Sequence, residues 1–192
     1  ALSFQLSQPG RAKAYHEAWN AWEKDQTTPK PKFSVAWDYF RHLFRRDVVI
    51  SVHTQIFQVF SMTITMLVDE FGLNVMPDHS DFDDYKATKL AVERDLTVIC
   101  GPRAWWMDGR DRTINGACAG HAKGGLKKIG VNTDAPVIPQ EDLPVMAAMG
   151  VRHGWNTYAA IAGMPRVPAI ALGLSDRVGS LGRMRRISAW RC

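Results

Sequence analysis

Three residues that can bind a metal or accept a proton each follow a short apolar run of the sequence. They are His53 after VVISV, His79 after LNVM and Asp134 after KIGVN. In folds with parallel strands the loops after the strands converge, so ligands bind at the carboxyl ends. Imidazole and carboxylate are ordinary ligands of zinc and similar divalent ions. A carboxylate there can also accept a proton from a metal-bound water, whose pKa the ion lowers.

Each of these residues also has a purely structural interpretation. A histidine at the end of a buried strand is commonly a core residue whose ring nitrogens have hydrogen-bond partners. Asp134 precedes Ala-Pro and could cap a turn or a helix. From residue types and spacing alone, a metal site and a structural role both remain open.

The elements that position these residues follow from the hydrophobic pattern. Short apolar runs alternate with amphipathic segments from residue 48 onward, which is typical of βαβ units and a parallel sheet covered on both faces. We predict an α/β fold with parallel strands alternating with helices, in four strand–helix units. The predicted strands are 48–52, 73–76, 96–100 and 128–132; the predicted helices are 55–71, 81–95, 139–154 and 156–164; a long Gly-rich connection covers 101–127.

The first 47 residues differ from the rest and predict two helices, 10–25 and 34–47, separated by a proline-rich break. Aromatic residues recur at helical spacing in both, and such stripes usually face a core. We therefore expect the following side chains to face inward: Tyr15, Trp19 and Trp22 in the first helix, and Trp37, Phe40 and Phe44 in the second.

Composition restricts the class of protein. The 192 residues are 46% hydrophobic and 22% charged, enough to form a core. Three cysteines without a CxxC pair suit a reducing compartment and predict a cytoplasmic protein. No transmembrane run is evident. Four arginines in residues 182–192 account for most of the net charge of +5 and leave +1 elsewhere, so we predict no specific nucleic-acid or membrane partner.

Several longer stretches resemble the amidohydrolase superfamily, in its imidazolonepropionase-related branch. The stretches VNTDAPVIPQEDLPVMAAMGVRHG and ALGLSDRVGSL are similar to the family's eighth strand and closing segment. Those around VISVHTQIF and HSDFDDYKATKLAVERDLTVICGP are similar to its fifth to seventh strands. The resemblance covers about residues 48–181 and implies the second half of a (β/α)8 TIM-type barrel.

The resemblance also implies an activity and a set of site residues. Such enzymes hydrolyse C–N bonds of amides, ureas or cyclic imides in small molecules, using water activated by zinc or a similar divalent ion. By position, His53 and His79 would be metal ligands, and Asp134 would be a metal ligand and the catalytic proton acceptor. Arg103 and His121, in the long connection, are candidates for substrate binding.

The chain also departs from the family's pattern. It has no His-x-His pair, which supplies metal ligands on the family's first strand, and residues 182–192 do not continue the family's sequence. We expect a helical lead-in (1–47), barrel strands five to eight with their helices (48–181) and an aberrant basic tail (182–192) produced by a frameshift or truncation. Alternatives are an inactive fragment that pairs with a missing amino-terminal half or forms a homo-oligomer, and a weak anion-binding module that uses the tail.

Overall fold

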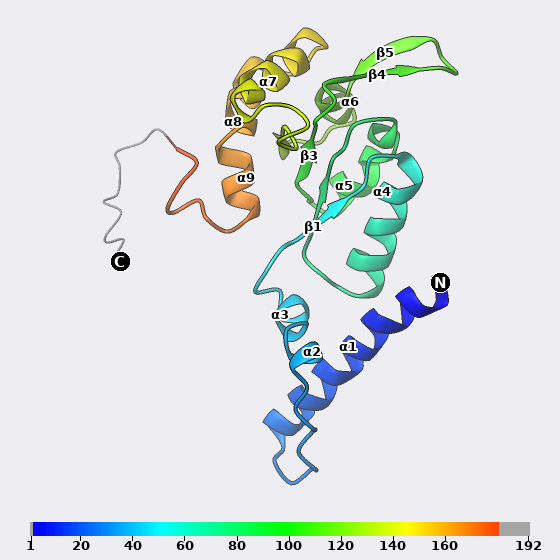
Figure 1. Cartoon of the computed structure of the whole chain (residues 1–192), viewed down its shortest axis with the longest axis vertical. Coiled ribbons are helices and arrows are strands. Elements are labelled where there is room, and N and C mark those ends of the chain that lie inside the picture. Colours follow the sequence, from blue (N-terminus) through cyan, green and yellow to red (C-terminus); the bar gives the residue numbers. More distant parts are fainter. Residues whose placement is uncertain (1, 181–192) are drawn as a thin grey trace. The chain divides into compact units, whose positions relative to one another are not determined.

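The computed structural model describes residues 2–180 of the chain (Figure 1). These residues divide into two compact units, which we describe separately. The amino-terminal unit contains residues 2–50 and 65–74, and the α/β unit contains residues 51–64 and 75–180. The basic tail predicted for 182–192 lies outside the described residues.

The amino-terminal unit is built on one long helix, α1 (Leu2–Lys24), and two short helices, α2 (Val35–Asp38) and α3 (Arg41–Phe44). Trp19 is only 9% exposed, and the Arg41 guanidinium carbon lies 5.3 Å from its ring centroid. Arg41 also donates to Glu23 at 2.6 Å, which ties α3 to α1. Arg41 is thus a buried cation held by both an aromatic ring and a carboxylate.

The segment 34–47 differs from the single helix that we predicted. It forms two separate turns of helix, because its four aromatic residues (Trp37, Tyr39, Phe40 and Phe44) have modest helix propensity. Phe40 is 37% exposed rather than buried, whereas Trp37 and Phe44 are half-buried. The aromatic stripe therefore contributes less to the core than its spacing predicted.

The α/β unit alternates strands with helices, as predicted. Two of its elements, β1 and η1, include residues of the amino-terminal unit. In chain order the elements are β1 (Ile50–His53), α4 (Phe57–Thr63), η1 (Ile64–Glu70), β2 (Val75–Asp78), η2 (Asp84–Ala87), α5 (Thr88–Glu93), β3 (Val98–Cys100), β4 (Trp105–Asp108), β5 (Thr113–Gly116), α6 (Ala117–Lys123), β6 (Ile129–Val131), η3 (Gln140–Asp142), α7 (Leu143–Arg152), α8 (Thr157–Gly163) and α9 (Arg166–Ala171). The predicted helix 55–71 is realised as α4 followed by the π-helix η1.

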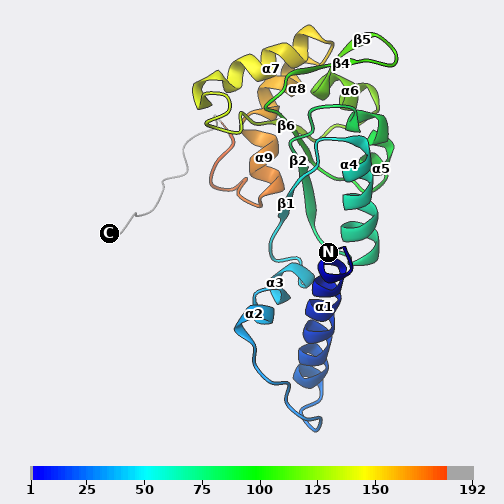
Figure 2. The same ribbon diagram turned by 45° about the vertical axis from the view of Figure 1, so that its right-hand side comes forward.

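The strands of the α/β unit are short, and three of them are buried. β3 and β6 pair in parallel, with Val98 opposite Ile129, and β1 pairs with β2. The Ser80 N–H donates to the Ile99 carbonyl at 3.1 Å, which joins the end of β2 to β3. Figure 2 shows these strands between α4 and α5 on one side and α9 on the other. Apolar runs without alternation, as in β3 and β6, are typical of parallel strands covered on both faces.

The connection 101–127, which we predicted as one long Gly-rich connection, contains an antiparallel hairpin and a helix. β4 pairs with β5, from Trp105 opposite Gly116 to Asp108 opposite Thr113, and α6 follows directly. Glycines and an exposed hairpin weaken the hydrophobic periodicity on which the prediction depended. Within the described part of the chain, no helix is long and apolar enough to cross a membrane.

Candidate functional site

The structure places several polar side chains at the carboxyl ends of the strands of the α/β unit. β1 ends with His53, β2 ends with Asp78 and is followed by His79, and β6 is followed by Asn132 and Asp134. Thr54 donates to the Asp78 carbonyl and Gln55 to the His79 carbonyl, so the chains that leave β1 and β2 stay side by side. The three predicted ligands are therefore carried by adjoining loops.

His53, His79 and Asp134 lie close together. The rings of His53 and His79 are 4.3 Å apart between centroids and meet edge to face at 84°. His79 Nδ1 lies 3.8 Å from Asp134 Oδ2. The His79 side chain is 18% exposed and that of Asp134 43% exposed, so solvent and small molecules can reach the carboxylate.

The backbone of this cluster is strained. His79 has a φ of 57° and Asp134 a φ of 49°, in the left-handed region that residues other than glycine seldom adopt. Such strain costs about 1 kcal/mol or more and is concentrated at functional sites. The strained residues here are two of the three that spacing singled out as ligands.

Asp78 holds the loops of the cluster in place. Its Oδ1 accepts from the His79 N–H at 2.8 Å and from Asn132 Nδ2 at 2.5 Å, and its Oδ2 accepts from Ser51 Oγ at 2.9 Å. These bonds connect β1, the end of β2 and the end of β6. We did not predict a role for Asp78, although it directly precedes His79 in the sequence.

Asp81 is a second carboxylate that sequence reasoning missed. It is 1% exposed, and its Oδ1 accepts from the Gly101 N–H at 2.9 Å. Burial raises the pKa of Asp81 to about 6, although backbone hydrogen bonds from Gly101 and Arg103 act in the opposite direction. The acid-rich stretch DFDD immediately after His79–Ser80 was the available indication, but burial cannot be read from it.

We predicted that Arg103 and His121 contact the substrate. Among the described residues, neither side chain contacts His53, His79 or Asp134. The exposed side chain of Arg103 places its guanidinium carbon 5.1 Å from the ring centroid of Phe82. His121 is 0% exposed, and its Nε2 and Nδ1 lie 2.9 Å from Ser80 Oγ and 2.8 Å from Thr88 Oγ1. Both ring nitrogens of His121 therefore have partners inside the core, and its contact with a substrate stays a prediction.

The side chains of the cluster are of the right kind to bind a divalent cation, but there are too few of them. Two imidazoles and a carboxylate are suitable ligands, and His79 Nδ1, Asp81 Oδ2 and Asn132 Oδ1 are buried without a hydrogen-bond partner. Among residues 2–180, however, no three His, Cys, Asp or Glu side chains are grouped as a metal site requires.

Comparison with known proteins supports the fold. The structure is similar to a crystal structure of an amidohydrolase from Thermotoga maritima MSB8, with a TM-score of 0.72 and 24% sequence identity. The match covers 89% of this chain but 44% of that chain, so the chain spans less than half the length of the protein that it matches. No protein-family model matches the chain, and no curated protein matches it. At this level of identity the comparison establishes an amidohydrolase-like fold.

Proposed function

We propose that the chain is part of an amidohydrolase-type hydrolase that cleaves C–N bonds of small amides, ureas or cyclic imides. The observation that carries this proposal is the contact of His53, His79 and Asp134 at the strand ends of a fold shared with an amidohydrolase. Function depends on such a site rather than on the fold, since one fold supports many activities.

In this proposal each residue of the cluster has a distinct role. His53 and His79 contribute imidazole ligands to a divalent ion, preferably zinc, and Asp134 accepts a proton. The ion supplies a water of lowered pKa when it is bound. Asp134 suits a proton acceptor because its side chain is 43% exposed and its Oδ2 lies 3.8 Å from His79 Nδ1, beside the proposed ligands.

The proposal requires further ligands, because three donors from two loops and a strand end do not surround an ion. We propose that they come from chain outside the 192 residues, which would complete the (β/α)8 barrel of which these strands form the second half. The share of the Thermotoga protein that lies outside the match, more than half of its length, is consistent with this.

The experiment that tests the proposal is zinc binding by the folded chain, with and without the cluster. We expect bound zinc, measured by mass spectrometry after dialysis, to fall about tenfold or more in His53→Ala, His79→Ala and Asp134→Ala. His42→Ala is the matched control, since the His42 side chain is 54% exposed and its Nδ1 lies 3.3 Å from Asp47 Oδ2, outside the cluster. Zinc retained by all three variants, or lost equally in His42→Ala, would contradict the proposed site.

Hydrolysis is a separate measurement. Zinc-loaded protein should release amine or ammonia from at least one amide, urea or cyclic imide, and Asp134→Ala should slow that reaction by about 10²-fold or more.

A second candidate is a catalytically inactive chain, and the absence of a three-donor metal group among residues 2–180 favours it. In that case Asp134→Ala changes neither turnover nor zinc content. Zinc binding without any hydrolysis would support the site and this second candidate together. Hydrolysis would then require the further chain that we propose supplies the remaining ligands.

A further inference from the structure

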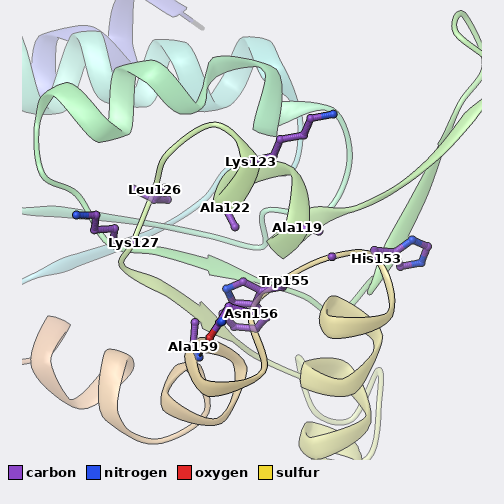
Figure 3. Close-up of a pocket in the computed structure, with 10 residues that line it drawn as sticks. Ala119, Ala122, Lys123, Leu126, Lys127, His153, Trp155, Asn156 and Ala159 are labelled. Atoms are coloured by element: carbon purple, nitrogen blue, oxygen red, sulfur yellow. Dashed lines mark hydrogen bonds between the residues drawn. The ribbon is translucent and has the colours of Figure 1, made fainter.

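One pocket of the α/β unit lies away from the strand-end cluster. Its volume is about 580 Å³, and it is bordered by the end of α6, the turn that leads to β6, and the loop that joins α7 to α8 (Figure 3). Lys127, on its edge, precedes β6, whereas Asp134 follows β6. The pocket is therefore at the amino-terminal end of β6 and the candidate metal ligands are at the carboxyl end.

The floor of the pocket is apolar and held rigidly. Trp155 is 4% exposed and lines the pocket together with Leu126 and three alanines. A Cβ on Gly150 would lie 2.7 Å from the Trp155 ring, and one on Gly163 would lie 2.5 Å from it. The indole thus occupies space that two glycines leave open on α7 and α8. A rigid aromatic floor suits a flat apolar ligand.

The charge of the pocket is one-sided. Lys123 and Lys127 line it and no acidic residue does. Every other lysine of the α/β unit has an acidic partner: Lys86 with Asp108, Lys89 with Glu93, and Lys128 with Asp95. Lys123 and Lys127 have no such partner among the residues that the structure describes. The two uncompensated lysines of this unit therefore both border the same pocket.

A polar group near the floor adds a hydrogen-bond donor. Asn156 Oδ1 accepts from the Ala159 N–H at 3.0 Å, which leaves the side-chain amide N–H groups free to donate. In Figure 3 the Lys123 and Lys127 side chains extend outward in different directions, and Trp155, Asn156 and Ala159 lie together. The flexible lysine stems allow either ammonium group to fold over a bound anion.

We propose that this pocket binds a small organic anion with a flat apolar body and one carboxylate or phosphate group. The apolar floor accommodates the body, and Lys123, Lys127 and the Asn156 amide receive the anionic group. The volume lies within the range of small-molecule pockets. His153 also lines the pocket, and no acidic residue does; we propose ligand binding here and assign the pocket no reaction. The proposal does not depend on hydrolase activity.

Calorimetric titration of the full chain with matched probes tests this proposal. Phenyl phosphate and phenylacetate have the proposed chemistry, benzyl alcohol lacks the charge, and inorganic phosphate lacks the apolar body. We expect both aryl anions to bind more tightly than either of the other two probes. The tighter of the two aryl anions identifies the preferred anionic group.

Variants connect the binding to the pocket. Replacing both lysines (Lys123→Gln with Lys127→Gln) should weaken the aryl anions about tenfold and leave benzyl alcohol unchanged. The matched control, Lys89→Gln with Lys128→Gln, removes the same charge outside this pocket and should have no effect. Ala122→Leu fills the pocket from a helix that tolerates leucine, and should abolish binding of every probe that has a ring.

Three results would overturn the proposal. They are absence of binding by both aryl anions at millimolar concentration, equal affinity for benzyl alcohol and phenyl phosphate, and equal weakening by the two double variants. Far-UV circular dichroism and thermal unfolding of each variant show that a loss of binding is not a loss of fold.

Discussion

The α/β unit contains two groups of histidine and carboxylate side chains with similar composition and opposite environments. In one, His121 is completely buried and both ring nitrogens have hydroxyl partners, while Asp84 Oδ1 lies 3.5 Å from Nε2. In the other, His53 is exposed, and His79 Nδ1 has no hydrogen-bond partner and lies 3.8 Å from the half-exposed Asp134.

The buried group consists of polar side chains that stabilise the fold. The strand-end cluster consists of polar side chains that remain available to bind a ligand. Ser80 Oγ donates to Asp84 Oδ2 and also lies 2.9 Å from His121 Nε2. Asp84 Oδ1 has no hydrogen-bond partner, but Asp84 is 0% exposed, so a ligand from solvent cannot reach it. The strand-end cluster keeps donors that the protein itself does not use. Because an unpartnered buried polar atom costs free energy, its persistence is reason to look for a ligand.

The largest effect that we predict comes from breaking the buried group. His121→Ala removes the partner of Asp84, Ser80 and Thr88 and leaves a cavity beside Phe60, whose ring centroid is 5.6 Å from that of His121. We expect the free energy of unfolding to fall by about 3 kcal/mol or more. Urea denaturation followed by circular dichroism measures it. A loss below about 1 kcal/mol would show that the network contributes little to stability.

A smaller effect concerns Asp81, which follows His79 of the exposed group and precedes Asp84 of the buried group in the sequence. Its pKa of about 6 in the folded protein exceeds the ordinary value of 3.8, so the folded state binds the proton more tightly than the unfolded state. The stabilisation is complete below pH 4 and is lost as the pH rises through 6, by at most about 3 kcal/mol. It is measured as the change in unfolding free energy from pH 4 to pH 7.

Asp81→Asn is the matched variant for this pH dependence. An asparagine oxygen can still accept from the Gly101 N–H, but it does not titrate. Relative to wild type, the variant should become more stable as the pH rises from 4 to 7. Parallel stability curves for the two proteins would show that Asp81 titrates normally.

The parts of this structure that could be predicted are those that depend on local pattern. Strands β2, β3 and β6 overlap the predicted strands, because runs of buried apolar residues between amphipathic helices specify parallel strands directly. The proximity of His53, His79 and Asp134 followed from the same reasoning, since the carboxyl ends of adjacent parallel strands meet.

The parts that could not be predicted depend on packing between distant residues. His121 was assigned to the long Gly-rich connection, but it lies on α6 and faces the core, where Ser80 and Thr88 are distant in sequence and close in space. The burial of Asp81 and the pocket under Lys123 likewise arise from elements that the sequence pattern did not reveal. In each case the sequence gives the residue type and its charge, but it does not give the burial or the neighbours of the side chain.

The smallest effect that we predict is the change in the free energy of unfolding when a histidine of the exposed group is removed, and it is compared with the effect of His121→Ala. His53 is exposed, and its one described side-chain contact is the edge-to-face packing against His79. His53→Ala should therefore change the free energy of unfolding by less than about 0.5 kcal/mol in the absence of metal. The same variant should lose bound zinc if the strand-end cluster is the metal site. A residue whose removal leaves the fold intact and abolishes metal binding is retained for its ligand, whereas a loss of stability comparable to that of His121→Ala would place His53 among the structural histidines.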